Sequence, residues 1–452
     1  MAWKGWAAGS LPLESCGFPM PPWAHLIAVF PCLSRKLRLA LPCIGLDGLG
    51  AGLQEVQWGQ VHISYAYDID ESLRAPLAAL HGDAVADGFQ LGRPNGDILT
   101  VDVTDWERVD LVVSGPPCPP WSAIGLRGSK QDVREVVFQQ VTNIVVDQAQ
   151  KGCFGFILEM VPGIDQKGSA GEQTYLATWL AQLRVRAPML RVFCWLLNTA
   201  DYLPHHRRRL YIVGVNWPLV RGSPVPPRVP YCAAASRATL EGVLHRGLSP
   251  LDEGWLPPPL RLNLAAWKQR LRREPGTLEV VATISVDRDP SMSFGPLVRT
   301  DGLVGALRSH NELNWIYIVD NRGVATVSRC MHPVERLTLQ GFRPELADFM
   351  SKSTLLRATG NAFSAPVAAA VMREFVVLLS CSRLLGLPGV LAVLRPRWLS
   401  KEEEETHLRK RRRLNIERSK LAILERRVAL LTFRSLACGQ PGRTCANHAT
   451  IV

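Results

Sequence analysis

The sequence predicts an α/β protein in which a mixed, mostly parallel sheet carries helices on both faces and a smaller, irregular domain is attached. Two observations predict the main domain. Short apolar runs typical of buried strands recur over residues 36–215, and stretches with helical periodicity lie between them. Such alternation indicates a largely parallel sheet covered on both faces. A third observation predicts the smaller domain, because residues 216–332 are rich in Pro, Arg and Gly.

The elements of the main domain follow one another in order. Each predicted strand is a short apolar run, and these runs are 37–42, 62–67, 109–113, 154–158, 192–197 and 210–215. Residues 131–149 place Val137, Val141 and Val145 on one helical face, and 174–183 repeat the pattern. We therefore expect helices over both stretches.

The rest of the chain sets the domain boundaries. The predicted segments are 1–35, a disordered or targeting leader; 36–215, the main domain; 216–332, the smaller domain; 333–380, a helical return to the main domain; and 381–452, a basic, partly helical tail. Within the tail, residues 395–434 hold 13 Lys or Arg against 6 Glu.

The composition indicates which class of partner and which cellular compartment to expect. The formal net charge of +12 and a pI near 9.4 favour a polyanionic partner over an acidic small substrate. The 11 cysteines are scattered, with no CxxC pair or zinc-type spacing, which indicates a reducing compartment and no metal. Breaks at Arg383, Gly386 and Pro388 make the apolar run 375–394 a poor membrane span, so we expect no membrane.

The most distinctive loop is 115–122, which reads Gly-Pro-Pro-Cys-Pro-Pro-Trp-Ser. Its four prolines fix φ on both sides of Cys118 and bias the preceding residues towards extended conformations. The loop follows the predicted strand 109–113, and strand ends are where α/β proteins place their chemistry. A stiff surface turn with an incidental cysteine is the alternative, and this loop alone does not decide between them.

Two further strand ends carry charge. Glu159 lies at the tip of the strand beginning at 154, where a buried carboxylate is costly unless it is paired or used. Residues 205–209 read His-His-Arg-Arg-Arg before the strand 210–215, and Arg207 and Arg209 have the parity to point to one side. Helix capping or pairing with arginine is the plain alternative for Glu159, and solvated charge is the plain alternative for the arginines.

In this order the three elements resemble the cytosine-5 nucleic-acid methyltransferase family. The family's motifs are Pro-Cys-Gln followed by an aromatic residue and Ser or Thr, then Glu-Asn-Val, then Gln-x-Arg-x-Arg. Here they match residues 117–122, 159–161 and 205–209. The spacing, 41 residues from Cys118 to Glu159 and 48 more to Arg207, is similar to the family's. Residues 335–342 and 360–368 resemble its two closing blocks.

The resemblance extends to a site for S-adenosylmethionine. Residues 43–48, Cys-Ile-Gly-Leu-Asp-Gly, correspond to the family's glycine loop, in which glycines let the backbone approach the cofactor. Asp68, an acid directly after the second predicted strand, would bind ribose hydroxyls, and the next residue, Ile69, would pack on the adenine. The implied cofactor residues are Gly45, Gly48, Asp68, Ile69, Asp97, Ile98, Pro116 and Asn361.

The resemblance also implies catalytic roles. Cys118 would add to C6 of cytosine as a thiolate, and Arg207 and Arg209 would lower its pKa and hold the base carbonyl. Glu159, when it is protonated or shares a proton, would donate to N3 as charge builds there. Three departures concern geometry and rate rather than reaction type: Met160 for Asn, Pro119 for Gln and His205 for Gln. In the cofactor half, Cys43 stands for an aromatic residue and Asp47 for Gly, and with Met160 these two support a catalytically weak, regulatory binder.

We therefore expect a Rossmann-like DNA (cytosine-5)-methyltransferase, with residues 216–332 as its target-recognition domain. That domain offers Arg299, Arg308 and Asn314 for base edges, although each is individually typical of a solvated loop. Two alternatives stay open: the same chemistry on transfer RNA, and a catalytically weak regulatory nucleic-acid binder. We expect a monomer. The basic run 410–413 is typical of a nuclear-import signal, which predicts a nuclear location, or of a phosphate-binding helix, and a solvated helix is the plain alternative.

Overall fold

The computed structural model describes most of the first 380 residues. The described stretches are 35–117, 133–166, 173–220, 230, 238–245, 253–271, 280–286, 298–309, 314–320 and 322–380. The chain divides into two compact units, Met1–Pro388 and Gly389–Val452, and every described residue belongs to the first. Cys118, Pro119, residues 1–34 and the basic tail lie outside the described residues.

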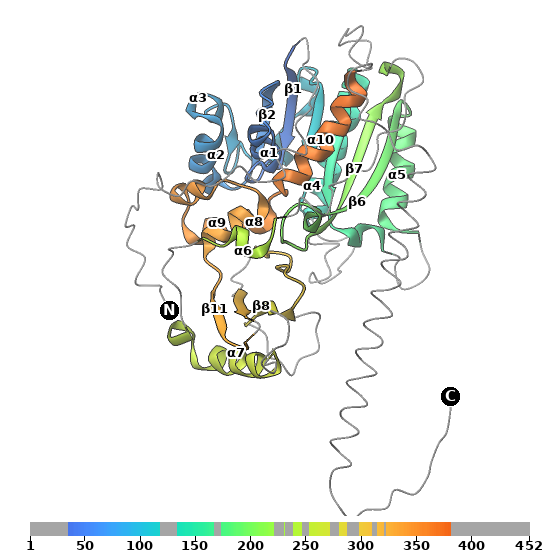
Figure 1. Cartoon of the computed structure of the whole chain (residues 1–452). Coiled ribbons are helices and arrows are strands. Elements are labelled where there is room, and N and C mark those ends of the chain that lie inside the picture. Colours follow the sequence, from blue (N-terminus) through green and yellow to red (C-terminus); the bar gives the residue numbers. More distant parts are fainter. Residues whose placement is uncertain are drawn as a thin grey trace, which may run out of the picture. The chain divides into compact units, whose positions relative to one another are not determined.

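A seven-stranded sheet with the order β3-β2-β1-β4-β5-β7-β6 forms the main domain (Figure 1). Its strands are β1 (Leu37–Pro42), β2 (Val61–Asp68), β3 (Gln90–Leu91), β4 (Leu111–Ser114), β5 (Gly155–Met160), β6 (Leu190–Asn198) and β7 (Arg208–Asn216). Pairings among β1 to β5 are parallel, whereas β7 runs antiparallel to β5 and β6. The predicted mixed, mostly parallel sheet is confirmed, and the six predicted strands match observed strands to within two residues at each end.

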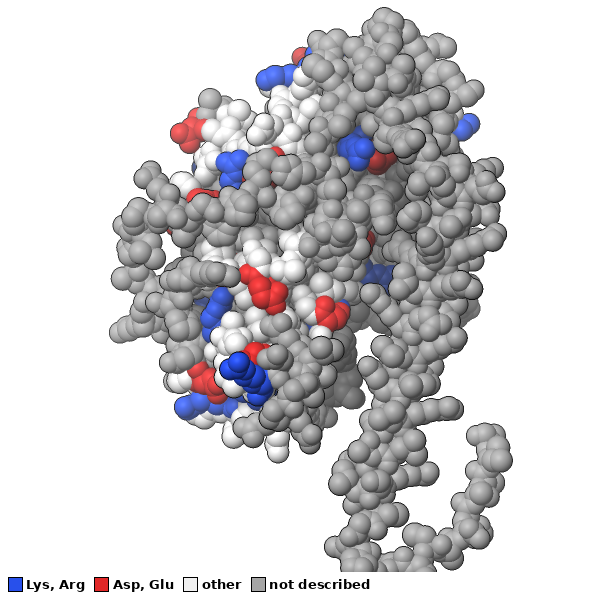
Figure 2. Space-filling model, viewed as in Figure 1, with Lys and Arg blue, Asp and Glu red and all other residues white. Residues whose placement is uncertain are grey.

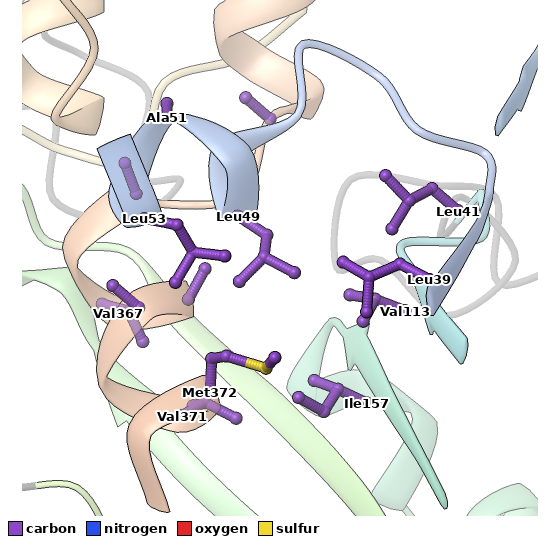
Figure 3. Close-up of a cluster of buried hydrophobic side chains, with 14 of the residues drawn as sticks. Leu39, Leu41, Leu49, Ala51, Leu53, Val113, Ile157, Val367, Val371 and Met372 are labelled. Carbon is purple, nitrogen blue, oxygen red and sulfur yellow. The ribbon is translucent and has the colours of Figure 1, made fainter. Parts of the chain in front are cut away.

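Helices cover both faces of this sheet because side chains alternate along its buried strands. Leu39 of β1 packs with α1 (Gly48–Glu55), α2 (Arg74–His81) and α10 (Ala365–Ser380), as the cluster in Figure 3 shows for α1 and α10. Its neighbour Ala40 belongs to the core under α4 (Val133–Gln150) and α5 (Tyr175–Arg186). The predicted helices over 131–149 and 174–183 thus correspond to α4 and α5.

The smaller domain is more regular than its composition predicts. It holds an antiparallel sheet in the order β11-β10-β8-β9, with a core of its own around Trp315. Its elements are α6 (Leu240–Val243), α7 (Pro258–Leu271), β8 (Val280–Ser285), β9 (Val298–Arg299), β10 (Asn314–Val319) and β11 (Ala325–Cys330). The strands are short and interrupted by Pro- and Arg-rich chain, which hides their periodicity in the sequence.

After the smaller domain the chain continues through three more helices. These helices are α8 (Pro333–Gln340), α9 (Lys352–Asn361) and α10. Helix α1 packs closely on α10 because Gly52 of α1 has no Cβ, and a Cβ there would collide with the carbonyl of Ala365. The stretch Lys352–Leu378 is long and apolar enough to cross a membrane, but 72% of its apolar window is buried in the protein. Burial of this kind is typical of a core helix.

Candidate active site at the carboxyl edge of the sheet

The candidate site lies where the strand order changes direction. From β1 the chain builds outward to β2 and β3 on one side and to β4 and β5 on the other. Ligands of open α/β sheets bind at such a switch point, beyond the carboxyl ends of the strands. Ser114 of β4 pairs with Leu158 of β5, so Gly115, the first residue after β4, lies beside Glu159, which still belongs to β5. The proline loop therefore begins next to Glu159.

Glu159 is held by two arginines from β7 and the loop before it. Its Oε1 lies 3.1 Å from Nε of Arg209 and 3.6 Å from Nη2 of Arg207. The carboxylate is 4% exposed, and a charge so deeply buried needs such compensation. The predicted parity of Arg207 and Arg209 is confirmed, because both reach the same carboxylate. The pairing alternative for Glu159 is also correct, and its partners are the arginines of the motif itself.

Arg207 is committed to the protein backbone. It donates from Nη1 to the carbonyl of Gly360 and from Nη2 to that of Ala362, both at 2.9 Å, and is 2% exposed. The second closing block, residues 360–368, is thereby tied to the arginine motif across about 150 residues of sequence. Arg209 is more accessible, with 18% of its side chain exposed. Of the two, Arg209 is better placed to act on a substrate.

His205 joins three segments through one imidazole. Its Nε2 accepts the backbone N–H of Leu307 at 3.2 Å, so Nδ1 carries the proton and donates to the carbonyl of Leu339 at 3.2 Å. Complete burial, and then the positive charges of Arg207 and Arg209, hold the pKa of His205 well below its usual value. This residue, which stands for the family's glutamine, is neutral and links the loop before β7 to the smaller domain and to α8.

Met160 has a different environment from Glu159. Side chains alternate along β5, so Met160 points to the opposite face of the sheet. There it is fully buried in the core shared with α4 and α5. The asparagine that the family has at this position would be buried in an apolar core here, which accounts for the methionine.

On the cofactor side, Asp68 ends β2 as a largely buried carboxylate. Its Oδ2 accepts the N–H of Gly45 at 2.9 Å and its Oδ1 that of Asp70 at 3.0 Å. Burial is the largest effect and raises the pKa of Asp68. The next side chain, Ile69, is 54% exposed, an unusual place for a large apolar residue. An acceptor beside an open apolar surface fits a ribose joined to a flat base.

Loop 92–97 brings the other predicted cofactor residues to the same edge. Gly92 donates its N–H to the carbonyl of Asp68 at 2.9 Å, and Asp97 caps a short 3₁₀ helix (Ile98–Thr100). The side chain of Ile98 is buried, whereas that of Asn361 is exposed at the end of α9. Pro116, the second residue of the proline loop, is buried. The cofactor roles of these residues stay predictions.

The glycine loop is built around two unpredicted contacts. Asp47 adopts a left-handed conformation with φ of 49°, and its Oδ1 caps α1 by accepting the N–H of Gly50 at 2.9 Å. Its Oδ2 lies 2.9 Å from Nε2 of His81. An aspartate thus fills the position of a family glycine by stabilising the helix start. Gly45 has φ of 56°, and a Cβ there would meet nothing within 4 Å, so open space lies before it.

These features fit an adenosyl cofactor. The glycine loop leaves room at Gly45, Asp68 offers carboxylate oxygens, and Ile69 offers an apolar surface. No group of three or more His, Cys, Asp or Glu within the described part of the chain is arranged to hold a metal ion.

Comparison with known proteins agrees with this geometry. A family model described as C-5 cytosine-specific DNA methylase matches residues 43–230. The orphan methyltransferase M.SPRI of Bacillus phage SPR is 25% identical over 187 residues, which are 41% of this chain and 39% of that protein. The type II methyltransferase M.NgoBI of Neisseria gonorrhoeae is 32% identical over 123 residues, which are 27% and 36%. The chain thus spans well under half the length of these relatives.

The solved structure of the Entamoeba histolytica methyltransferase EhMeth is similar in fold. It superposes with a TM-score of 0.53 at 11% identity, over 76% of this chain and 98% of that one. The likeness in fold therefore extends beyond the segment matched by the family model.

Proposed function

Since residues 43–230 of this chain belong to the C-5 cytosine-specific DNA methylase family, we propose that the protein transfers a methyl group from S-adenosylmethionine to C5 of cytosine in DNA. The observation that carries the proposal is the buried Glu159, held by Arg207 and Arg209 directly beside the start of the proline loop. Charged groups so deeply buried at a strand end are typical of a site that uses them.

Cys118 is the proposed nucleophile. Its thiolate adds to C6 of cytosine, and the electrons of the 5,6 double bond make C5 able to attack. The cofactor, when bound, supplies an electrophilic methyl group on a sulfonium. After transfer, a base removes the proton from C5, the double bond re-forms and the sulfur leaves C6. No described residue is assigned as that base.

Glu159 and Arg209 orient the cytosine in this proposal. The site lies within the protein, so the base must leave the DNA stack to enter it. Glu159 offers the edge of the base a carboxyl group whose position is fixed by two guanidinium groups. Arg209 is partly exposed and supplies a donor for the base carbonyl. Arg207 acts indirectly, by holding residues 360–362.

The cofactor would be held by backbone and two side chains. Asp68 accepts from the ribose hydroxyls with its remaining lone pairs, and Ile69 packs against the adenine. Gly45 lets the backbone of the loop approach. Gly48, Asp97, Ile98, Pro116 and Asn361 complete the proposed set.

DNA is preferred to transfer RNA because the matched family and the curated relatives are DNA methylases or type II methyltransferases. The described part of the smaller domain contributes little direct support for binding DNA. Arg299 is paired with Asp301 and Asn314 is buried. On the face in Figure 2, described basic and acidic side chains are interspersed rather than gathered in one basic patch. The basic run 410–413 supports a proposed nuclear location.

A covalent trap tests this proposal. The protein is incubated with labelled S-adenosylmethionine and with either DNA or transfer RNA that contains 5-fluorocytosine, whose fluorine cannot leave as a proton does. We expect a stable adduct with DNA in the wild type and none in Cys118→Ala. Cys194→Ala removes an exposed thiol elsewhere and should trap normally. An adduct with RNA alone would replace the DNA assignment by the tRNA one, and no adduct with either polymer contradicts the activity.

A further inference from the structure

Phe363 is an aromatic side chain at the switch point of the sheet. It follows the segment 360–362 that Arg207 holds, and it precedes α10. A Cβ on Gly48, at the start of α1, would lie 2.8 Å from the Phe363 Cβ and would also collide with its carbonyl. A Cβ on Gly115, after β4, would collide with the ring. Phe363 therefore lies against the loops that follow both β1 and β4, and glycines make this approach possible.

The ring packs against the core of the main domain and stays partly exposed. It packs edge to face on Tyr211, with ring centroids 6.2 Å apart at 76°. Tyr211 is fully buried and pairs across the sheet with Glu159. Phe363 itself is half-buried, as is Gly115, whose built Cβ would collide with the ring. A large apolar ring is thus held beside the residues that follow β1 and β4, and part of it stays exposed.

The order of the strands indicates which part of a cofactor would meet this ring. Asp68 and Ile69 end β2, the glycine loop follows β1, and Gly115 follows β4 three residues before Cys118. Adjacent strands lie about 4.8 Å apart, so the ends of β2 and β4 are separated by about 10 Å. A cofactor with its adenosine at β2 reaches β4 with its sulfur, because the methyl group must arrive next to the thiol.

We propose that Phe363 forms the wall of the cofactor site at the sulfonium end and favours the charged cofactor over its neutral product. This inference rests on the proposed function. The face of an aromatic ring attracts a cation, as in the recognition of quaternary ammonium groups. Residues 43–48 contain no aromatic side chain, so the glycine loop itself cannot provide this contact.

Calorimetric binding tests the proposal without measuring turnover. The affinities for S-adenosylmethionine and for S-adenosylhomocysteine, the neutral thioether, are compared in the wild type, Phe363→Leu and Phe363→Tyr. In Phe363→Leu we expect affinity for the sulfonium to fall by about 2- to 30-fold, and affinity for the thioether to fall less. Phe363→Tyr should keep the wild-type ratio. Phe349→Leu, which changes an exposed phenylalanine on the 3₁₀ helix Pro344–Phe349, should alter neither affinity.

Partial unfolding of a variant lowers the apparent binding of both ligands together, so it leaves the ratio of the two affinities unchanged. An unchanged ratio in Phe363→Leu would overturn the inference, whether both affinities stay the same or both fall equally. A wild type that binds neither ligand would instead contradict the proposed function, and the inference would fall with it.

Discussion

The two halves of the candidate site hold their charged groups in different ways. On the base-binding side, Glu159 is paired with the side chains of Arg207 and Arg209. On the proposed cofactor side, the oxygens of Asp68 accept hydrogen bonds from the backbone N–H groups of Gly45 and Asp70. Loss of the charge on Glu159 leaves buried opposite charges uncompensated. Substitutions on the cofactor side should lower the stability by smaller amounts. We therefore expect the largest effects of substitution around Glu159.

Glu159→Ala should have the largest effect. It leaves the fully buried Arg207 and the partly buried Arg209 without their anion, and we expect a loss of about 3 kcal/mol in the free energy of unfolding. Urea denaturation measures this loss. Glu71→Ala, which breaks an exposed pair with Arg74, is the matched control and should cost less than about 1 kcal/mol. Equal losses in the two variants would show that the buried pairing does not stabilise the site.

Arg207→Lys should come next. Lysine cannot reproduce the fork that donates to the carbonyls of Gly360 and Ala362, so we expect a loss of about 2 kcal/mol in unfolding free energy. Affinity for S-adenosylhomocysteine should also fall, because the loop before Phe363 is released. The neighbouring, exposed Arg208→Lys should change neither quantity. If the two variants behave alike, Arg207 does not hold the closing block.

Asp47 tests the cofactor side through a pair of variants. Asp47→Ala loses the cap on α1 and the contact with His81 but keeps the strained left-handed backbone, so we expect a loss of about 2 kcal/mol. Asp47→Gly loses the same contacts but relieves the strain, and should cost about 1 kcal/mol or less. Melting temperatures compare the two. A glycine variant less stable than the alanine variant would contradict this account of the loop.

His205→Gln should have the smallest effect at neutral pH, because an amide can both accept from Leu307 and donate to Leu339. The wild-type imidazole has a lowered pKa, so it stays neutral in the folded protein while the unfolded chain takes up a proton below pH about 6.5. Stability that is present above that pH is therefore lost as the pH falls, by about 1.4 kcal/mol per pH unit for one proton.

Melting curves between pH 8 and pH 5 measure this dependence. His205→Gln should decline less steeply than the wild type. Some decline should remain, because burial also lowers the pKa of His332, to about 4. An identical decline in both proteins would show that His205 is not the buried neutral group described above.

Much of the fold was predictable because it depends on local patterns. Apolar runs and helical spacing located the strands and helices of the main sheet, since buried elements repeat their side-chain period along the chain. The position of Glu159 at a strand end and the parity of Arg207 and Arg209 were predictable for the same reason. The four-stranded sheet was not, because its strands are short and separated by Pro- and Arg-rich segments.

The contacts that complete the site were beyond prediction from one sequence. Arg207 meets Gly360, His205 meets Leu307, and Asp47 meets His81, and each pair is brought together only by the folded chain. Some signals were nevertheless present. An aspartate in a glycine position indicates a local capping bond, and the phenylalanine at 363 lies inside the block 360–368, which resembles a family motif.

Peptide mapping of the 5-fluorocytosine adduct tests the central claim most directly. After trapping on DNA in the presence of S-adenosylmethionine, the protein is digested and the peptide that carries the nucleotide is identified by mass spectrometry. The account predicts a single modified residue, Cys118, joined to a base that has also gained a methyl group. Modification at another cysteine such as Cys194, or at Cys118 without methyl transfer, would contradict it.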